Sequence, residues 1–114
     1  MDTSDDGPDL APALREAGNN LCGVLRGHLD ASAVAEHFVR AGWTSRSSSW
    51  DAYEVGTGWC RVDLEPADGP DILLNGVIAP DGLDALATLL SRFGLRFGLE
   101  LYDDEGGLCR EITV

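Results

Sequence analysis

Hydrophobic and polar residues alternate with a period of two through the middle of the chain. The clearest example runs from 59 to 65, where Cys60, Val62 and Leu64 alternate with charged or aromatic residues. Such alternation is typical of a strand with one buried face. We predict three consecutive antiparallel strands between 50 and 78, joined by a glycine turn at 56–58 and an acidic, proline-containing turn at 65–71. The last strand, 72–78, is almost continuously apolar, which indicates a central strand covered on both faces.

Two further stretches have apolar residues at helical spacing instead. The first, 29–43, has Asp30 placed to cap a helix, an apolar stripe that includes Val34 and Phe38, and Gly42 at its end. The second, 81–94, follows a Pro-Asp pair and ends at Gly94 in the same way. Each stretch therefore predicts one helix with a single buried face.

The C-terminal part returns to strand periodicity. Residues 96–102 and 108–114 alternate on either side of an acidic, glycine-rich turn at 103–107, which predicts a hairpin. The stretch 44–49 is entirely polar and is interpreted as a connector, residues 10–17 suggest a short helix, and 21–26 fit either a helix or a strand. The predicted fold is α+β, an antiparallel sheet of about five strands with two helices packed on one face, in the order α-β-β-β-α-β-β.

Length and composition limit the number of domains and the kind of partner. The chain of 114 residues predicts a single domain, 10–114, preceded by an acidic, mobile tail at 1–9. The net charge is −12, and all eight basic residues are arginines. Such a surface repels phosphate backbones, so we expect no nucleic-acid partner, whereas a basic protein would be attracted at long range. The alternative is that the charge serves solubility alone.

Membrane and redox signals point to a reducing compartment. No apolar run approaches the roughly 20 residues of a membrane span, and the acidic start is unlike a signal peptide. Cys22, Cys60 and Cys109 are widely spaced and odd in number, which favours reduced thiols over a disulfide framework. We therefore expect a cytoplasmic protein with no membrane partner. The oligomeric state is left open.

Candidate metal-binding and catalytic groups have simpler structural explanations. The consecutive acids Asp103, Asp104 and Glu105 lack the alternating ligands and the distant bidentate glutamate of a calcium loop. The cysteines and histidines are too scattered for a zinc site. Cys60 with His37 is formally a nucleophile and a base, yet Cys60 is in phase with core residues and has no evident cation beside it to lower its pKa. The sequence thus predicts no enzyme, no cofactor and no metal.

The sheet face opposite the helices is the strongest candidate for a binding surface. Strand phase places an exposed tryptophan and tyrosine there among charged side chains, a combination typical of protein interfaces. The predicted face comprises Ala52, Glu54, Trp59, Arg61, Asp63, Glu65, Arg96, Glu100, Tyr102 and Glu111. The residues predicted to bind a partner are Trp59, Arg61, Asp63, Glu65, Glu100, Tyr102, Asp103 and Asp104. Alternatively, Trp59 packs beneath the N-terminal segment and the face is an ordinary solvated one.

Several runs together resemble small acidic immunity proteins of bacterial polymorphic-toxin systems. They are Ala41-Gly42-Trp43, the strand sequences 53–55 and 59–64, and the ending 100–107, within a resemblance that spans 29–114. The arginine-only, Ala-, Gly- and Asp-rich usage resembles that of a high-GC bacterium, and the element order resembles the type III secretion chaperone-like fold without its final helix. Immunity families share a role rather than site chemistry, so the resemblance implies no functional residue.

These observations predict a non-catalytic protein-binding module. The resemblance implies an immunity, antitoxin-type or chaperone-like protein, and the charge adds a basic partner, a toxin domain for example, masked by an acidic and aromatic sheet face. The alternative is a small ligand-binding or regulatory domain with a pocket between helix and sheet.

Overall fold

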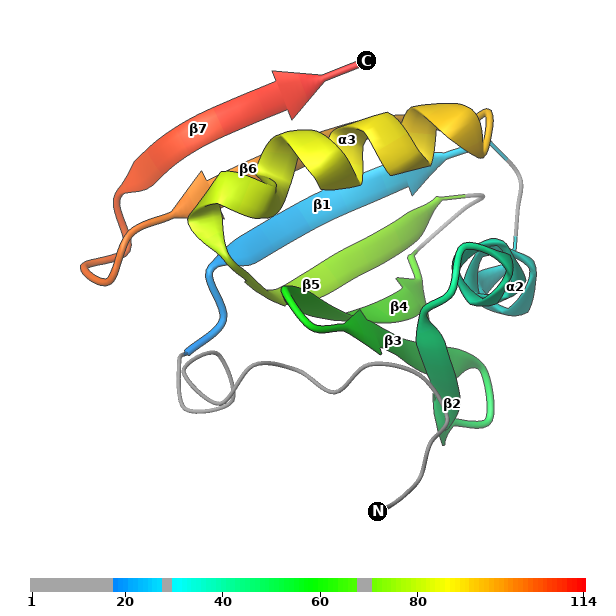
Figure 1. Ribbon diagram of the computed structural model, residues 1–114. Helices are drawn as coiled ribbons and strands as arrows, with labels where there is room; N and C mark the ends of the chain where they lie inside the picture. The colour runs from blue at the N-terminus through cyan, green and yellow to red at the C-terminus, as the bar shows by residue number, and fades with distance from the viewer. Residues whose placement is uncertain (1–17, 28–29, 68–70) are drawn as a thin grey trace.

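The computed structural model describes residues 18–27, 30–67 and 71–114. Within these ranges the chain forms an α+β domain, one antiparallel sheet of seven strands with two α-helices (Figure 1). The strands are β1 (Leu21–Arg26), β2 (Thr44–Ser49), β3 (Ala52–Thr57), β4 (Cys60–Pro66), β5 (Ile72–Ile78), β6 (Arg96–Tyr102) and β7 (Leu108–Thr113). The helices are α2 (Ala31–Arg40) and α3 (Leu83–Arg92), and a 3-10 turn, η1 (Pro80–Gly82), leads into α3.

The strands lie in the order β2-β3-β4-β5-β1-β6-β7, and every neighbouring pair is antiparallel. Two connections therefore join parallel strands through a helix: α2 leads from β1 to β2, and α3 leads from β5 to β6. β1 and β5 point in opposite directions, and the two connections run toward opposite edges of the sheet. If both crossovers have the same hand, these two reversals cancel, and both helices lie on the same face of the sheet. In Figure 1, α3 lies along β6, while α2 lies against β2, β3 and β4 at the other side of the sheet.

Both helices begin and end where the sequence predicts, to within a few residues. The carboxylate Oδ1 of Asp30 accepts a hydrogen bond from the amide of Ala33 at 2.8 Å, which satisfies one unpaired amide of the first turn of α2. Gly42 and Gly94 have φ angles of +97° and +81°, the left-handed conformation that ends a helix. After each glycine the chain returns to the sheet, and Trp43 and Leu95 are buried.

The core fills the space between the two helices and the inner face of the sheet. Both helices and β1, β3, β4, β5 and β6 contribute to one buried cluster. Its fully enclosed members include Val34, Phe38, Val55, Cys60, Leu64, Leu74, Ile78, Leu86, Leu90, Phe97 and Leu99. Each large apolar side chain buried in this way contributes about 1.5–3 kcal/mol relative to an exposed one. The predicted alternation is confirmed for 60–65 and for 96–102, but it does not extend to Trp59.

Asn20 ties β1 into its central place in the sheet. Its side-chain amide donates to the carbonyl of Ile78 at 2.9 Å and accepts from the amide of Ile78 at 2.9 Å. Its backbone carbonyl accepts from the amide of Tyr102 at 2.8 Å. Asn20 thus forms hydrogen bonds with both β5 and β6, which fixes the register of β1 between these two strands.

The sheet has two more strands than the sequence predicted. Residues 44–49 form the edge strand β2 and not a connector; five of its six residues are exposed, so it has no buried positions to reveal a period of two. Residues 21–26 form β1 and not a helix. Its alternation, Leu21-Gly23-Leu25, is hidden because the middle inward position must be glycine: a Cβ there would lie 2.8 Å from the carbonyl oxygen of Gly98.

Two details of the central hairpins were also predicted wrongly. The β3–β4 turn consists of Gly58 and Trp59, while Gly56 lies inside β3 and neither glycine has a positive φ. β5 is the fourth of the seven strands, which confirms a central place, but Leu73 is 41% exposed, so its second face is not fully covered.

The acidic tail at 1–9, the predicted helix at 10–17 and Leu29 lie outside the described residues. In the ranges that the structure covers, no helix has the length and hydrophobicity needed to cross a membrane.

Candidate functional site: the outer face of the sheet

The face of the sheet turned away from α2 and α3, here called the outer face, carries one polar row across all seven strands. Seven residues in register form this central row, and they are Arg46, Glu54, Asp63, Asn75, Cys22, Glu100 and Glu111. The strand alternation that turns apolar neighbours toward the core turns these side chains outward. Side chains directly opposite each other on neighbouring strands are close enough to interact, so each residue of the row can affect the residues beside it.

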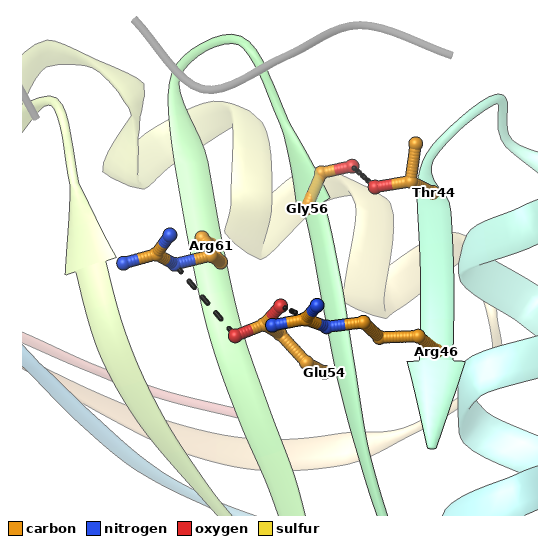
Figure 2. Close-up of polar contacts among 5 residues, drawn as sticks. All are labelled: Thr44, Arg46, Glu54, Gly56 and Arg61. Atoms are coloured by element: carbon orange, nitrogen blue, oxygen red, sulfur yellow. Dashed lines mark hydrogen bonds and ion pairs between the residues drawn. The ribbon is translucent and has the colours of Figure 1, made fainter. Parts of the chain in front are cut away.

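At the β2–β4 end of the row, two arginines of the chain pair with the carboxylate of Glu54. The Nε of Arg46 lies 3.0 Å from Oε1 of Glu54, and the Nε of Arg61 lies 3.9 Å from Oε2 of the same carboxylate (Figure 2). Figure 2 also shows Thr44, whose hydroxyl donates to the carbonyl of Gly56 at 3.1 Å and joins β2 to β3. Glu54 is therefore clamped between two guanidinium groups of this chain.

Asp63 is the carboxylate of this cluster whose charged form is disfavoured by its surroundings. Partial burial, and then the nearby charges of Glu54 and Glu65, raise the pKa of Asp63, while Arg61 and Arg46 act in the opposite direction. Like charges directly across two strands oppose each other, and Glu54 and Asp63 are such a pair. An added cation near Asp63 would relieve that repulsion.

At the β6–β7 end, a second acidic pair has no such arginines. Glu100 and Glu111 lie directly opposite each other, and among the described residues no ion pair includes either of them. The hydroxyl of Tyr102 donates to Oε1 of Glu100 at 2.8 Å. That hydrogen bond, followed by burial and the negative charge of Glu100, raises the pKa of Tyr102. This tyrosine therefore stays a neutral donor and leaves the negative charge of the pair in place.

A pocket of about 290 Å³ opens between these two ends, over β5, β1, β6 and β7. Its floor is apolar, formed by Val24 and Leu73, and Gly98 contributes no side chain to it. The polar residues that line it are Cys22, Arg26, Asn75, Glu100, Glu111 and Thr113. Arg26 lines the pocket on one side of the Val24–Gly98 row, and Glu100 and Glu111 line it on the other, so the pocket has a basic end and an acidic end. The thiol of Cys22 donates to Oδ1 of Asn75 at 3.0 Å.

Most residues predicted to bind a partner lie on this face, in two groups. Arg61, Asp63 and Glu65 are on β4, and Glu100 and Tyr102 are on β6, with β5 and β1 between them. The two groups are thus brought onto one surface without touching each other.

The predicted place of Trp59 on this face is wrong. Trp59 is the second residue of the β3–β4 turn, so strand phase does not apply to it. Its ring packs edge-on against the buried ring of Trp43, with ring centroids 5.4 Å apart, and covers Gly82, where a Cβ would lie 2.6 Å from the indole. Trp59 therefore closes the core between α2 and η1, and Tyr102 is the aromatic residue that the outer face retains from the prediction.

The two aspartates of the β6–β7 turn have different surroundings. The carboxylate of Asp103 accepts hydrogen bonds from the amides of Glu105 and Gly107 at 2.9 Å and 2.8 Å, so it shapes the turn. Asp104 is exposed in the same turn.

The sequence prediction missed the pocket because it left 21–26 open between a helix and a strand and did not place β1 in the sheet. Cys22, Val24 and Arg26 alternate with Leu21 and Leu25, and this alternation is the signal that would have placed them on the outer face. The alternation predicted for 96–102 turns Gly98 outward together with Glu100. No sequence pattern, however, shows that the strands beside Gly98 leave space there.

The alternative catalytic pair lacks an accessible nucleophile. Cys60 is fully buried, and burial raises the pKa of its thiol to about 12. The ring of His37 stacks on Phe93, with centroids 5.0 Å apart. No group of three or more potential metal ligands occurs among the residues that the structure describes.

Comparisons of the chain with protein-family models, with curated proteins and with solved structures found no match in any of the three. The resemblance to immunity proteins therefore stays a prediction.

Proposed function

We propose that this protein is a non-catalytic binding module that masks a basic protein partner with the outer face of its sheet, in the manner of an immunity, antitoxin-type or chaperone-like protein. The observation that carries the proposal is the central row, in which four carboxylates cross the sheet in register beside an accessible pocket that Val24 and Leu73 line with apolar surface. Aligned charges around an apolar centre are the usual anatomy of a protein interface.

The charge pattern on the outer face suits a basic partner and would fix how that partner is aligned on the sheet. The outward carboxylates are Glu54, Asp63, Glu65, Glu100 and Glu111. Of these, Glu54 is held by arginines of the chain itself, and the others are available to a partner's cations within the described structure. With a net charge of −12, the whole molecule would also accelerate association with a basic protein.

The area of the face agrees with this role. Seven strands spaced about 4.8 Å apart, each of six or seven residues, form a surface about 30 Å wide and about 20 Å long. Its projected area of roughly 600 Å², increased by side-chain relief, approaches the ~800 Å² per partner of a standard interface. Masking needs only that the bound face cover a functional cleft of the partner, and no reacting group is required.

The test is co-expression with the product of the adjacent gene, followed by measurement of complex formation and association rate. The double variant Asp63→Lys, Glu65→Lys should slow association and flatten its dependence on salt, because rim charges act mainly through the association rate. Glu36→Lys on α2 changes charge on the opposite side of the molecule and should have little effect. If no complex forms, if the protein leaves the partner's toxicity unchanged, or if the double variant associates at the wild-type rate, the proposal is wrong.

A small ligand-binding or regulatory domain is a second candidate, favoured by the pocket itself. The pocket lies on the outer face, however, whereas the sequence prediction placed one between helix and sheet. At about 290 Å³ it is at the lower limit of small-molecule sites. A saturable rise in thermal stability with a small metabolite, in the absence of any protein partner, would support this candidate over the first.

A further inference from the structure

We propose that the pocket at Gly98 receives one arginine side chain of the basic partner and holds its guanidinium between Glu100 and Glu111. This inference rests on the proposed function, and it identifies the anchor of the interface. The stem of the arginine would lie on Val24 and Leu73, and its head would reach the acidic end of the pocket.

The first argument is that packing does not require a glycine at position 98. A Cβ built on Gly98 meets no atom within 4 Å, and the residue has no positive φ. Two other glycines in strand interiors, Gly23 and Gly76, would bring a Cβ into close contact with neighbouring backbone. A glycine in a strand interior weakens the sheet, and a close approach of a ligand or another backbone is one of the reasons for such a glycine. Gly98 therefore leaves space for an occupant.

The second argument is a comparison of the two acidic pairs in the central row. The Glu54–Asp63 pair has Arg46 and Arg61 of this chain beside it. The Glu100–Glu111 pair is also directly opposed across two strands, yet no ion pair of the described residues neutralises it. Like charges placed directly opposite destabilise a sheet, and a cation bound between them would remove that repulsion. The missing positive charge is one that a partner can supply.

The third argument is the shape and polarity of the space. The rows of Gly98 and Glu100 are separated by two residues along β6, about 7 Å, a distance that an extended arginine side chain spans. Leu73 is 41% exposed beside the pocket and offers apolar contact to methylene groups. Arg26 lines the basic end and would repel a cation there, which orients the head toward the glutamates.

Arginine fits this site better than lysine. Two carboxylates on neighbouring strands offer several acceptor oxygens close together, and the guanidinium fork can donate to both carboxylates at once. An ammonium group would be attracted as a point charge without the same geometric match. The proposal thus predicts a preference between two side chains of equal charge.

A titration with N-acetyl-arginine amide, followed by the amide signals in a ¹H–¹⁵N NMR spectrum, tests the site without any partner. We expect saturable shifts at Val24, Gly98, Glu100 and Glu111, weaker shifts with N-acetyl-lysine amide, and none with N-acetyl-citrulline amide, which has the same shape without the charge. Equal shifts with the citrulline probe, shifts elsewhere only, or no saturable shift would overturn the inference.

Two variants separate this inference from the proposed function. Gly98→Val fills the pocket, and Glu111→Gln removes one charge; each should weaken the arginine probe and the partner complex about tenfold or more. Glu36→Gln on α2 is the matched control. Circular dichroism and thermal unfolding would confirm that each variant is folded. A partner complex of unchanged affinity in Gly98→Val would overturn the arginine anchor but leave the masking function standing. Saturable NMR shifts with the arginine probe, together with the absence of any partner complex, would support the arginine site but overturn the masking function.

Discussion

Two glycines on the strands that flank β1 should respond in opposite ways to the same substitution. Gly76 on β5 and Gly98 on β6 both lie in strand interiors with ordinary φ angles. A Cβ on Gly76 would overlap the carbonyl oxygen of Arg61 and lie 2.6 Å from the Cα of Val62, so β4 and β5 would have to separate. A Cβ on Gly98 meets nothing within 4 Å.

The expected magnitudes follow from these contacts. Gly98→Ala should raise the free energy of unfolding by about 0.5–1 kcal/mol, because alanine loses less backbone entropy on folding than glycine. Gly76→Ala should lower it by about 1–3 kcal/mol or more, since the clash is with backbone that cannot rotate away. Urea unfolding followed by tryptophan fluorescence measures both, and a separation of several degrees in melting temperature should accompany them. Equal effects of the two substitutions would refute the register of β4 with β5 and the open space above β6.

Three further predictions test other parts of the description. Trp59→Ala should lower the unfolding free energy by about 3–5 kcal/mol because the ring closes the core, whereas Trp50→Ala, whose side chain is 92% exposed, should change it by less than about 0.5 kcal/mol in a denaturant titration. Cys60 should resist iodoacetamide at pH 8 while the exposed Cys109 reacts, as measured by mass spectrometry. The fold raises the pKa of the Cys60 thiol from 9.0 to about 12, so the unfolded chain loses this proton first as the pH rises. The unfolding free energy should therefore fall between these two pH values, and it should fall less in Cys60→Ala. Asp63→Asn should raise the unfolding free energy at pH 7, since the fold raises the pKa of this carboxyl, and the gain should shrink as the pH falls through that pKa.

The parts of the fold that the sequence predicts correctly are those where one residue type has one physical role. Asp30 and Gly42 mark the ends of α2 because capping and a left-handed residue depend on local geometry. The alternation in β4 and β6 is readable because each strand has one face in the core and one outside. Such features are decided within a few residues, so they need no knowledge of the rest of the chain.

The features that the sequence did not predict depend on neighbours far away in the chain. β1 is concealed by Gly23, which is required because Gly98 and Leu99 of another strand lie against it. β2 is an edge strand whose polar residues are suited to solvent on both sides, and only its pairing with β3 makes it a strand. Tryptophan is a residue type that is enriched at interfaces, but the β3–β4 turn lies one or two positions later than the predicted turn, so Trp59 packs against the core. The pocket shares this origin, since it needs β1 between β5 and β6.

The distribution of charge on the outer face separates binding from solubility, which the net charge alone does not. A surface that only keeps a protein in solution has no reason to place Glu100 opposite Glu111 without a cation, because the pair weakens the β6–β7 hairpin. Glu111→Arg should therefore stabilise the fold, by about 0.2–1 kcal/mol for a favourable cross-strand pair. The same substitution should abolish binding of the basic partner and of the arginine probe, since a cation would then occupy the acidic end. A gain in stability together with a loss of binding is the behaviour of a functional site that stability alone would not maintain. If Glu111→Arg left the affinity for the partner unchanged, the acidic pair would have no part in recognition.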